Sequence, residues 1–200
     1  MMVIQTMDRP QMKLDYAAPE HHVTLRVGLP PAIRKTLLES TRTEWEGHPR
    51  FGGKAAFFMN IHRDLLRGTA GLSTGLKQLM DVPEGDLAEA SKAMRLRPYA
   101  RQLISFAHHH HEIEDHGYFP QFALLYPGLD RALALLDGDH KALDAALDET
   151  GTAINGLGSG DLTRDHIAAL HSGADALEHI LNRHIWDEEE IIIPIFLRHT

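Results

Sequence analysis

The sequence predicts an all-α protein: an antiparallel four-helix bundle preceded by an N-terminal extension that contains one further helix. Three observations support this fold class. Apolar residues recur at spacings of three and four over four long stretches, as on the buried face of a helix. Proline and glycine separate these stretches. The connections are short, which favours antiparallel neighbours, and 200 residues suffice for one domain with a sizeable core.

The predicted extension comprises residues 1–50, and the predicted bundle domain comprises residues 51–200. Within the extension, residues 22–27 alternate in a way typical of a short strand or an extended arm. Pro31 lies near the first turn of a helix that we expect to run to about Glu46. No motif in this region indicates a function, and the sequence leaves homodimerisation through it open.

The bundle helices are predicted at residues 54–80, 98–126, 129–154 and from 162 almost to the C-terminus. Each has a histidine in the middle of its apolar stripe, namely His62, His110, His140 and His184. In the second and fourth helices a glutamate follows one turn later, namely Glu114 and Glu188. A glutamate in a dry core is costly unless a partner compensates its charge. We therefore expect these six side chains to meet around a buried cation.

The second and fourth helices repeat each other. His110-x-x-x-Glu114 and His184-x-x-x-Glu188 are each followed by an acidic residue and then a proline, and the first and third helices supply the lone histidines. Residues four apart share a helix face, so each pair can reach one ion or two neighbouring ions. The two similar halves suit two adjacent ions bridged by carboxylates. Three acidic neighbours could hydrogen-bond the ligands or join them: Asp115, Asp139 and Glu189.

Composition excludes several other classes of site. A formal net charge of −8 argues against a nucleic-acid-binding face, which would be basic. The absence of cysteine excludes disulfides, thiolate metal sites and cysteine nucleophiles. No export signal and no membrane-spanning apolar run are visible, so we expect a soluble cytoplasmic protein. Imidazole and carboxylate ligands together suit iron, manganese or zinc.

The histidine run 108–111 wraps around a helix, so its four side chains cannot all point inward. His110 fits the apolar stripe best. We expect His109 and His111 to face solvent or a neighbouring helix.

Taken together, these elements resemble the hemerythrin-like (HHE cation-binding) family over roughly residues 54–198. The matching elements are His62, the segment 110–115 leading to Pro120, the pair Asp139-His140, and the segment 184–189 leading to Pro194. The resemblance implies a four-helix bundle with a non-haem centre of two iron ions, bridged by carboxylates and an oxo or hydroxo group. It also implies the ligand role for His62, His110, Glu114, His140, His184 and Glu188. Family members variously carry dioxygen, sense oxygen, iron or redox state, handle nitric oxide, or decompose peroxide.

The chain departs from the oxygen-carrying members of that family at one position. The carriers have a further histidine one turn before the third-helix ligand, where this chain has Leu136. Glu188 and Glu189 are also both candidates for the fourth-helix carboxylate. With four inward histidines in place of five, the sequence favours sensing or oxidative-stress handling over oxygen carriage. The small molecule would be dioxygen, peroxide or nitric oxide.

Two other functions remain open from the sequence. One is a zinc- or manganese-dependent hydrolase, which would need a substrate pocket and an additional acid or base such as His111 or Glu112. The other is a regulatory binding module in which the metal is structural and residues 1–50 contact a partner. The sequence does not decide whether the protein is an enzyme, a sensor or a storage protein.

Overall fold

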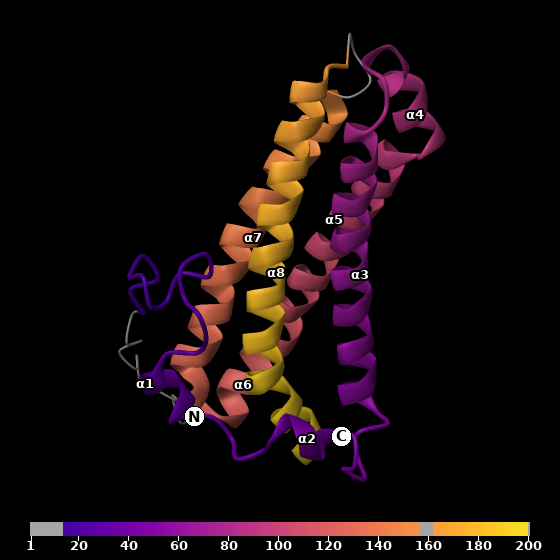
Figure 1. Ribbon diagram of the computed structural model, residues 1–200. Helices are drawn as coiled ribbons and strands as arrows, with labels where there is room; N and C mark the ends of the chain where they lie inside the picture. Colours follow the sequence, from indigo (N-terminus) through magenta and orange to yellow (C-terminus); the bar gives the residue numbers. More distant parts are fainter. Residues whose placement is uncertain (1–13, 157–161, 200) are drawn as a thin grey trace, which may run out of the picture.

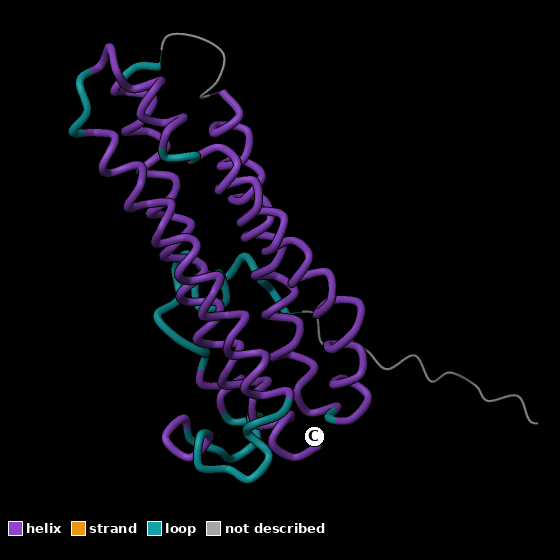
Figure 2. Tube along the Cα trace, turned by 90° about the vertical axis from the view of Figure 1, so that its right-hand side faces the viewer, coloured by secondary structure: helices purple, strands orange, loops and turns teal. Residues whose placement is uncertain are grey.

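The computed structural model describes residues 14–156 and 162–199. Within these residues the chain forms helices and turns and contains no strand, so the predicted all-helical class is confirmed there. The long helices are α3 (Lys54–Met80), α5 (Leu96–Ile113), α7 (Asp130–Gly156) and α8 (Arg164–His199). Figures 1 and 2 show them side by side in one elongated body.

Three of the long helices begin and end within two residues of the predicted bounds, but the second differs. It starts at Leu96 and passes at Ile113 into a π-helical turn, η2 (Glu114–Tyr118), and then into α6 (Phe119–Leu125). A 3-10 turn (Pro127–Leu129) leads into α7. Between α3 and α5 lie a 3-10 turn (Glu84–Asp86) and the short helix α4 (Leu87–Ala93).

The secondary structure predicted for residues 14–50 was wrong in two places. Residues 22–27 form turns: the backbone N–H of Arg26 donates to the carbonyl of His22 at 3.0 Å. The alternation there does not mark one buried face, because Val23 is buried whereas Leu25 and Val27 are exposed. The helix expected up to Glu46 is instead two single turns, α1 (Pro31–Arg34) and α2 (Arg42–Trp45).

Hydroxyl side chains explain why the second of these predictions failed. Thr36 donates its hydroxyl to the carbonyl of Ile33 at 2.7 Å, just past the end of α1. Thr41 begins α2 with a capping box that it shares with Glu44. Threonine side chains that hydrogen-bond the local backbone favour helix ends over helix interiors.

The long helices bury two separate apolar clusters, one towards each end of the bundle. On α3, Phe58 belongs to one cluster and Leu65 to the other, and His62 lies between them. On α7, Leu136 and Leu143 flank His140 in the same way. The fold therefore places these buried histidines in a layer between the two apolar clusters. No helix within the described residues is both long and apolar enough to cross a lipid bilayer.

Candidate metal centre

Buried imidazoles and carboxylates from all four long helices and η2 meet in this layer. They form two groups, one of His62, His110, Glu114 and Glu188 and one of His111, His140 and His184. In each group, one potential ligand atom per residue lies within 4.8 Å of those of the others. No member is more than 6% exposed. All six residues predicted from the sequence are brought together, and His111 is added.

The inward-facing atoms of these groups have no hydrogen-bond partner within the described residues. They are the Nε2 atoms of His62, His110, His111, His140 and His184 and both carboxylate oxygens of Glu114 and Glu188. Each buried polar group left unsatisfied costs about 1–3 kcal/mol. So many orphaned ligand atoms in one place indicate that a cation completes the layer.

Each glutamate lies between the two groups. Glu114 approaches His110 Nε2 at 3.1 Å and His140 Nε2 at 3.4 Å. Glu188 approaches His62 Nε2 at 3.2 Å and His184 Nε2 at 3.5 Å. Two ligand atoms that each lie about 2.1 Å from one ion are about 3 Å apart, so these separations fit shared coordination. Each carboxylate can therefore reach an ion in either group.

On the outer side of the layer, four of the imidazoles contact a carboxylate through Nδ1. The pairs are His62–Glu189 at 3.1 Å, His111–Asp144 at 2.7 Å, His140–Asp115 at 2.8 Å and His184–Asp139 at 3.2 Å. A carboxylate at Nδ1 holds the proton there and leaves Nε2 free to bind metal. Asp115, Asp139 and Glu189 thus lie behind the histidines, and the sequence reading did not single out Asp144.

The two central glutamates differ in their electrostatic surroundings. Burial and the nearby charge of Glu188 raise the pKa of Glu114 well above its usual range. Burial alone would also raise the pKa of Glu188, but contacts with His184 and His62 hold it well below that range. Two carboxylates this close repel each other in a dry layer, and a cation between them would reverse that repulsion.

The pKa values of the histidines differ as well: they are lowered for His110 and His111 and raised for His184. Burial and the neighbouring His62 lower the pKa of His110 to about 2. Burial lowers the pKa of His111 to about 4 despite its hydrogen bond with Asp144. Burial works against protonation of His184 too, but the hydrogen bond with Asp139 and the contact with Glu188 raise its pKa to about 9. His110 and His111 are thus held as neutral imidazoles, the form that binds metal.

The sequence prediction had His111 facing solvent or a neighbouring helix and did not count it among the ligands; the structure buries it against α7, beside the predicted ligand His140. It is 2% exposed and stacks on His140 with ring centroids 4.3 Å apart. Helix α5 packs against both α3 and α7, so adjacent residues 110 and 111 can both face the interior. His109 is exposed, as predicted.

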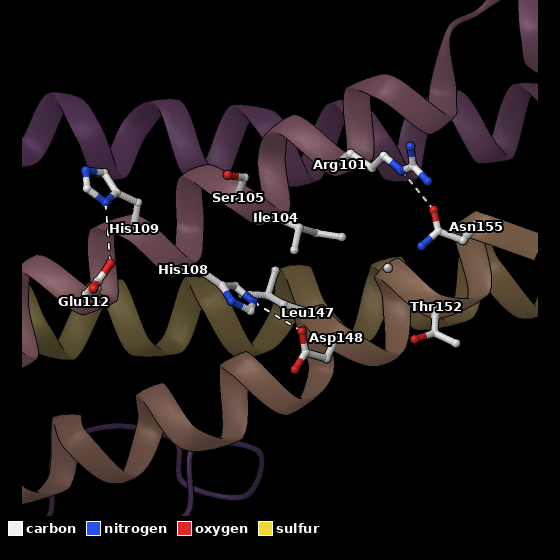
Figure 3. Close-up of a pocket in the computed structure, with 11 residues that line it drawn as sticks. Arg101, Ile104, Ser105, His108, His109, Glu112, Leu147, Asp148, Thr152 and Asn155 are labelled. Atoms are coloured by element: carbon white, nitrogen blue, oxygen red, sulfur yellow. Dashed lines mark hydrogen bonds and ion pairs between the residues drawn. The ribbon is translucent and has the colours of Figure 1, made fainter.

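A surface groove lies close by, between α5 and α7 (Figure 3). His108 faces Asp148 there at 3.7 Å, and His109 faces Glu112 at 3.8 Å. None of the buried ligand candidates lines this groove. Arg101 also donates to Asn155 there at 2.9 Å. The lining of the groove is therefore separate from the ligand candidates.

Comparison with known proteins agrees with this geometry. Residues 54–196, which include every member of both groups, match the family model described as the hemerythrin HHE cation binding domain. No curated protein and no solved structure was found to match the chain. Because the family match covers most of the chain and its cation-binding description agrees with the orphaned ligand atoms, this protein belongs to the hemerythrin HHE cation-binding domain family.

Proposed function

We propose that this protein holds two iron ions side by side in an antiparallel four-helix bundle and uses them to bind or react with dioxygen, peroxide or nitric oxide. One observation carries the proposal: two groups of ligand atoms without hydrogen-bond partners in the described part of the chain share a layer, and each of two glutamates approaches histidines of both groups. The family match supports cation binding, for which iron is the typical metal.

The proposed ligand set follows the two groups. His62 and His110 would hold one ion, and three further histidines would hold the other: His111, His140 and His184. Glu114 and Glu188, which each approach histidines of both groups, would balance the charge of both ions. Imidazole and carboxylate donors without thiolate suit iron.

Bound iron would supply electrons and an open coordination position for the small molecule. The protein's own residues have three tasks. The apolar clusters on both sides exclude water from the layer. The outer carboxylates orient the imidazoles. Asp115, whose side chain is 28% exposed, contacts His140 and offers a path for a proton between that imidazole and solvent.

The number of histidines bears on the role of the centre. The expectation against oxygen carriage rested on four inward histidines, and His111 makes five around the layer. The number of inward histidines therefore no longer favours sensing or oxidative-stress handling over oxygen carriage. Comparing the reactions of the three small molecules separates these roles, because a carrier releases dioxygen unchanged.

The hydrolase alternative is not favoured, because the ligand atoms are buried and the nearby groove does not reach them. The division at residue 50, the cytoplasmic location and homodimerisation stay predictions. The negative net charge supports the expectation that nucleic acid is not a partner.

The decisive experiment measures metal content and absorption. Protein from iron-supplemented cells should contain about two irons per chain. Ferrous protein prepared without oxygen should gain near-ultraviolet absorption when oxygen, peroxide or nitric oxide is added. The matched control is the double variant Glu114→Gln, Glu188→Gln, which keeps side-chain volume but cannot supply the two negative charges. One zinc per chain, or no metal with intact helices, would refute the proposal and favour the binding-module alternative.

A further inference from the structure

Residues 14–50, here called the N-terminal strap, lie outside the four long helices but reach into the layer behind the metal ligands. In Figure 1 the strap runs past α7 and continues beneath α8 as α2. Two of its arginines contact acidic residues there: Arg26 contacts Asp139 and Asp187, and Arg42 contacts Glu189. Asp139 and Glu189 are carboxylates that contact ligand histidines through Nδ1.

Arg26 is the more deeply buried of the two, with a side chain only 1% exposed. Its Nη1 donates to Asp139 Oδ1 at 2.7 Å, and its Nε donates to Asp187 Oδ2 at 2.8 Å. Its Nη2 donates to the other oxygen of Asp139. That same oxygen lies 3.2 Å from His184 Nδ1. The guanidinium therefore fixes both oxygens of the carboxylate that orients His184.

A tyrosine and a glycine show that the docking of the strap is built into α7. Tyr16 donates its hydroxyl to Asp139 Oδ1 at 2.7 Å. Its ring lies directly on Gly138, where an added Cβ would be 2.2 Å from the ring. Glycine within a helix is unfavourable, so a tight contact at Gly138 indicates that space for the strap outweighs helix propensity.

Arg42 makes a similar connection on the other side of the layer. Its Nη1 donates to Glu189 Oε2 at 2.5 Å, and Glu189 Oε1 lies 3.1 Å from His62 Nδ1. The guanidinium also stacks on Trp186, 3.8 Å from the ring centroid. The strap thus stands behind one histidine of each ligand group.

We propose that the N-terminal strap is part of the metal centre and that Arg26 is a positioning residue: it locks Asp139 so that the Nε2 of His184 is held towards the ion. This inference rests on the proposed function. Guanidinium fixes a carboxylate in a plane through several directed hydrogen bonds, which an ammonium cannot do. Without Arg26, Asp139 and Asp187 would also be buried with less compensation of their charge.

The test compares three variants of the full chain: Arg26→Met, Gly138→Ala and, as the matched control, Arg183→Met. Arg183 also pairs with Asp187, at 3.0 Å, and donates to the carbonyl of Val27 in the strap at 3.0 Å, but no contact joins it to Asp139 in the described structure. The control therefore removes one strap contact and one partner of Asp187 without touching Asp139. Gly138→Ala removes the space for Tyr16 while favouring the α7 helix, so it separates strap docking from folding. Ferrous iron affinity is measured by chelator competition without oxygen, together with the oxidised absorption spectrum and helical circular dichroism.

Arg26→Met and Gly138→Ala should each weaken iron binding by about 10- to 100-fold and shift the near-ultraviolet bands, at unchanged helicity. Arg183→Met should change affinity by less than about threefold. If both test variants match Arg183→Met in affinity and spectrum, the inference is wrong. If Arg26→Met does not fold, the iron affinity and spectrum of Gly138→Ala alone test the inference. Wild-type protein that binds no iron would instead refute the proposed function, so the two failures are distinguishable.

Discussion

The two groups of ligand atoms share α5 and α8, but only one of them includes α3 and only the other includes α7. One combines His62 of α3 with His110 of α5, and the other combines His111 of α5 with His140 of α7 and His184 of α8. Helix α5 serves both because it packs between α3 and α7, which lets two adjacent residues point to different groups. A repeated motif can therefore yield two unequal sites when one helix, here α5, packs against two other helices.

Removing a glutamate should have the largest effect, because each one is shared by both groups. For Glu114→Gln we expect iron content to fall from about two to below one per chain, since the amide carries no charge to offset two cations. Metal analysis after anaerobic loading measures this. The control is Glu112→Gln, an exposed position two residues earlier, on α5. Full loading of Glu114→Gln would show that the groups do not share this carboxylate.

His111→Ala should affect one group and spare the other. We expect affinity for one of the two ions to fall by at least about 100-fold, above the range typical for losing an outer hydrogen bond. Iron titration followed by absorption should then saturate near one ion per chain. His109→Ala is the matched control, because this neighbouring imidazole is exposed. Equal titrations for the two variants would remove His111 from the ligand set.

In metal-free protein, the buried neutral imidazole of His111 should make the free energy of unfolding depend on pH. Its pKa is lowered from 6.5 to about 4, so between these pH values the imidazole is protonated in the unfolded chain but neutral in the folded chain. The free energy of unfolding must therefore decrease as pH falls from about 6.5 towards 4, by roughly 3 kcal/mol from this residue alone. Urea unfolding of chelator-treated wild type and His111→Ala at pH 7 and pH 4.5 measures the difference. The same pH slope in both would contradict the expected neutral, buried state.

The smallest effect is expected for Asp144→Asn. Asp144 contacts Nδ1 of His111 at 2.7 Å but is 41% exposed, so water can replace the lost charge. We expect iron affinity to change by less than about tenfold, and less than in Asp139→Asn, whose carboxylate is fully buried. Chelator competition on both variants ranks them. A larger effect for Asp144→Asn would mean that His111 depends on its outer partner more than His184 does.

The sequence by itself predicted the parts that helical periodicity encodes. Spacings of three and four placed α3, α7 and α8 within two residues of their bounds. The same spacings identified the six residues from His62 to Glu188 that meet in the buried layer. The helix bounds and the meeting of these residues could be predicted because a polar residue in an apolar stripe is recognisable within its own helix, whereas their role as metal ligands stays a prediction.

Only the tertiary structure decided the rest. The inward position of His111 depends on α7 lying beside α5, which no local pattern reports. The burial of Arg26 depends on Asp139 and Asp187, which lie 113 and 161 residues away in the chain. Periodicity describes how a residue faces its own helix axis, whereas these contacts depend on which distant segments become neighbours. For that reason the ligand layer was visible in the sequence, and the arginines behind it were not.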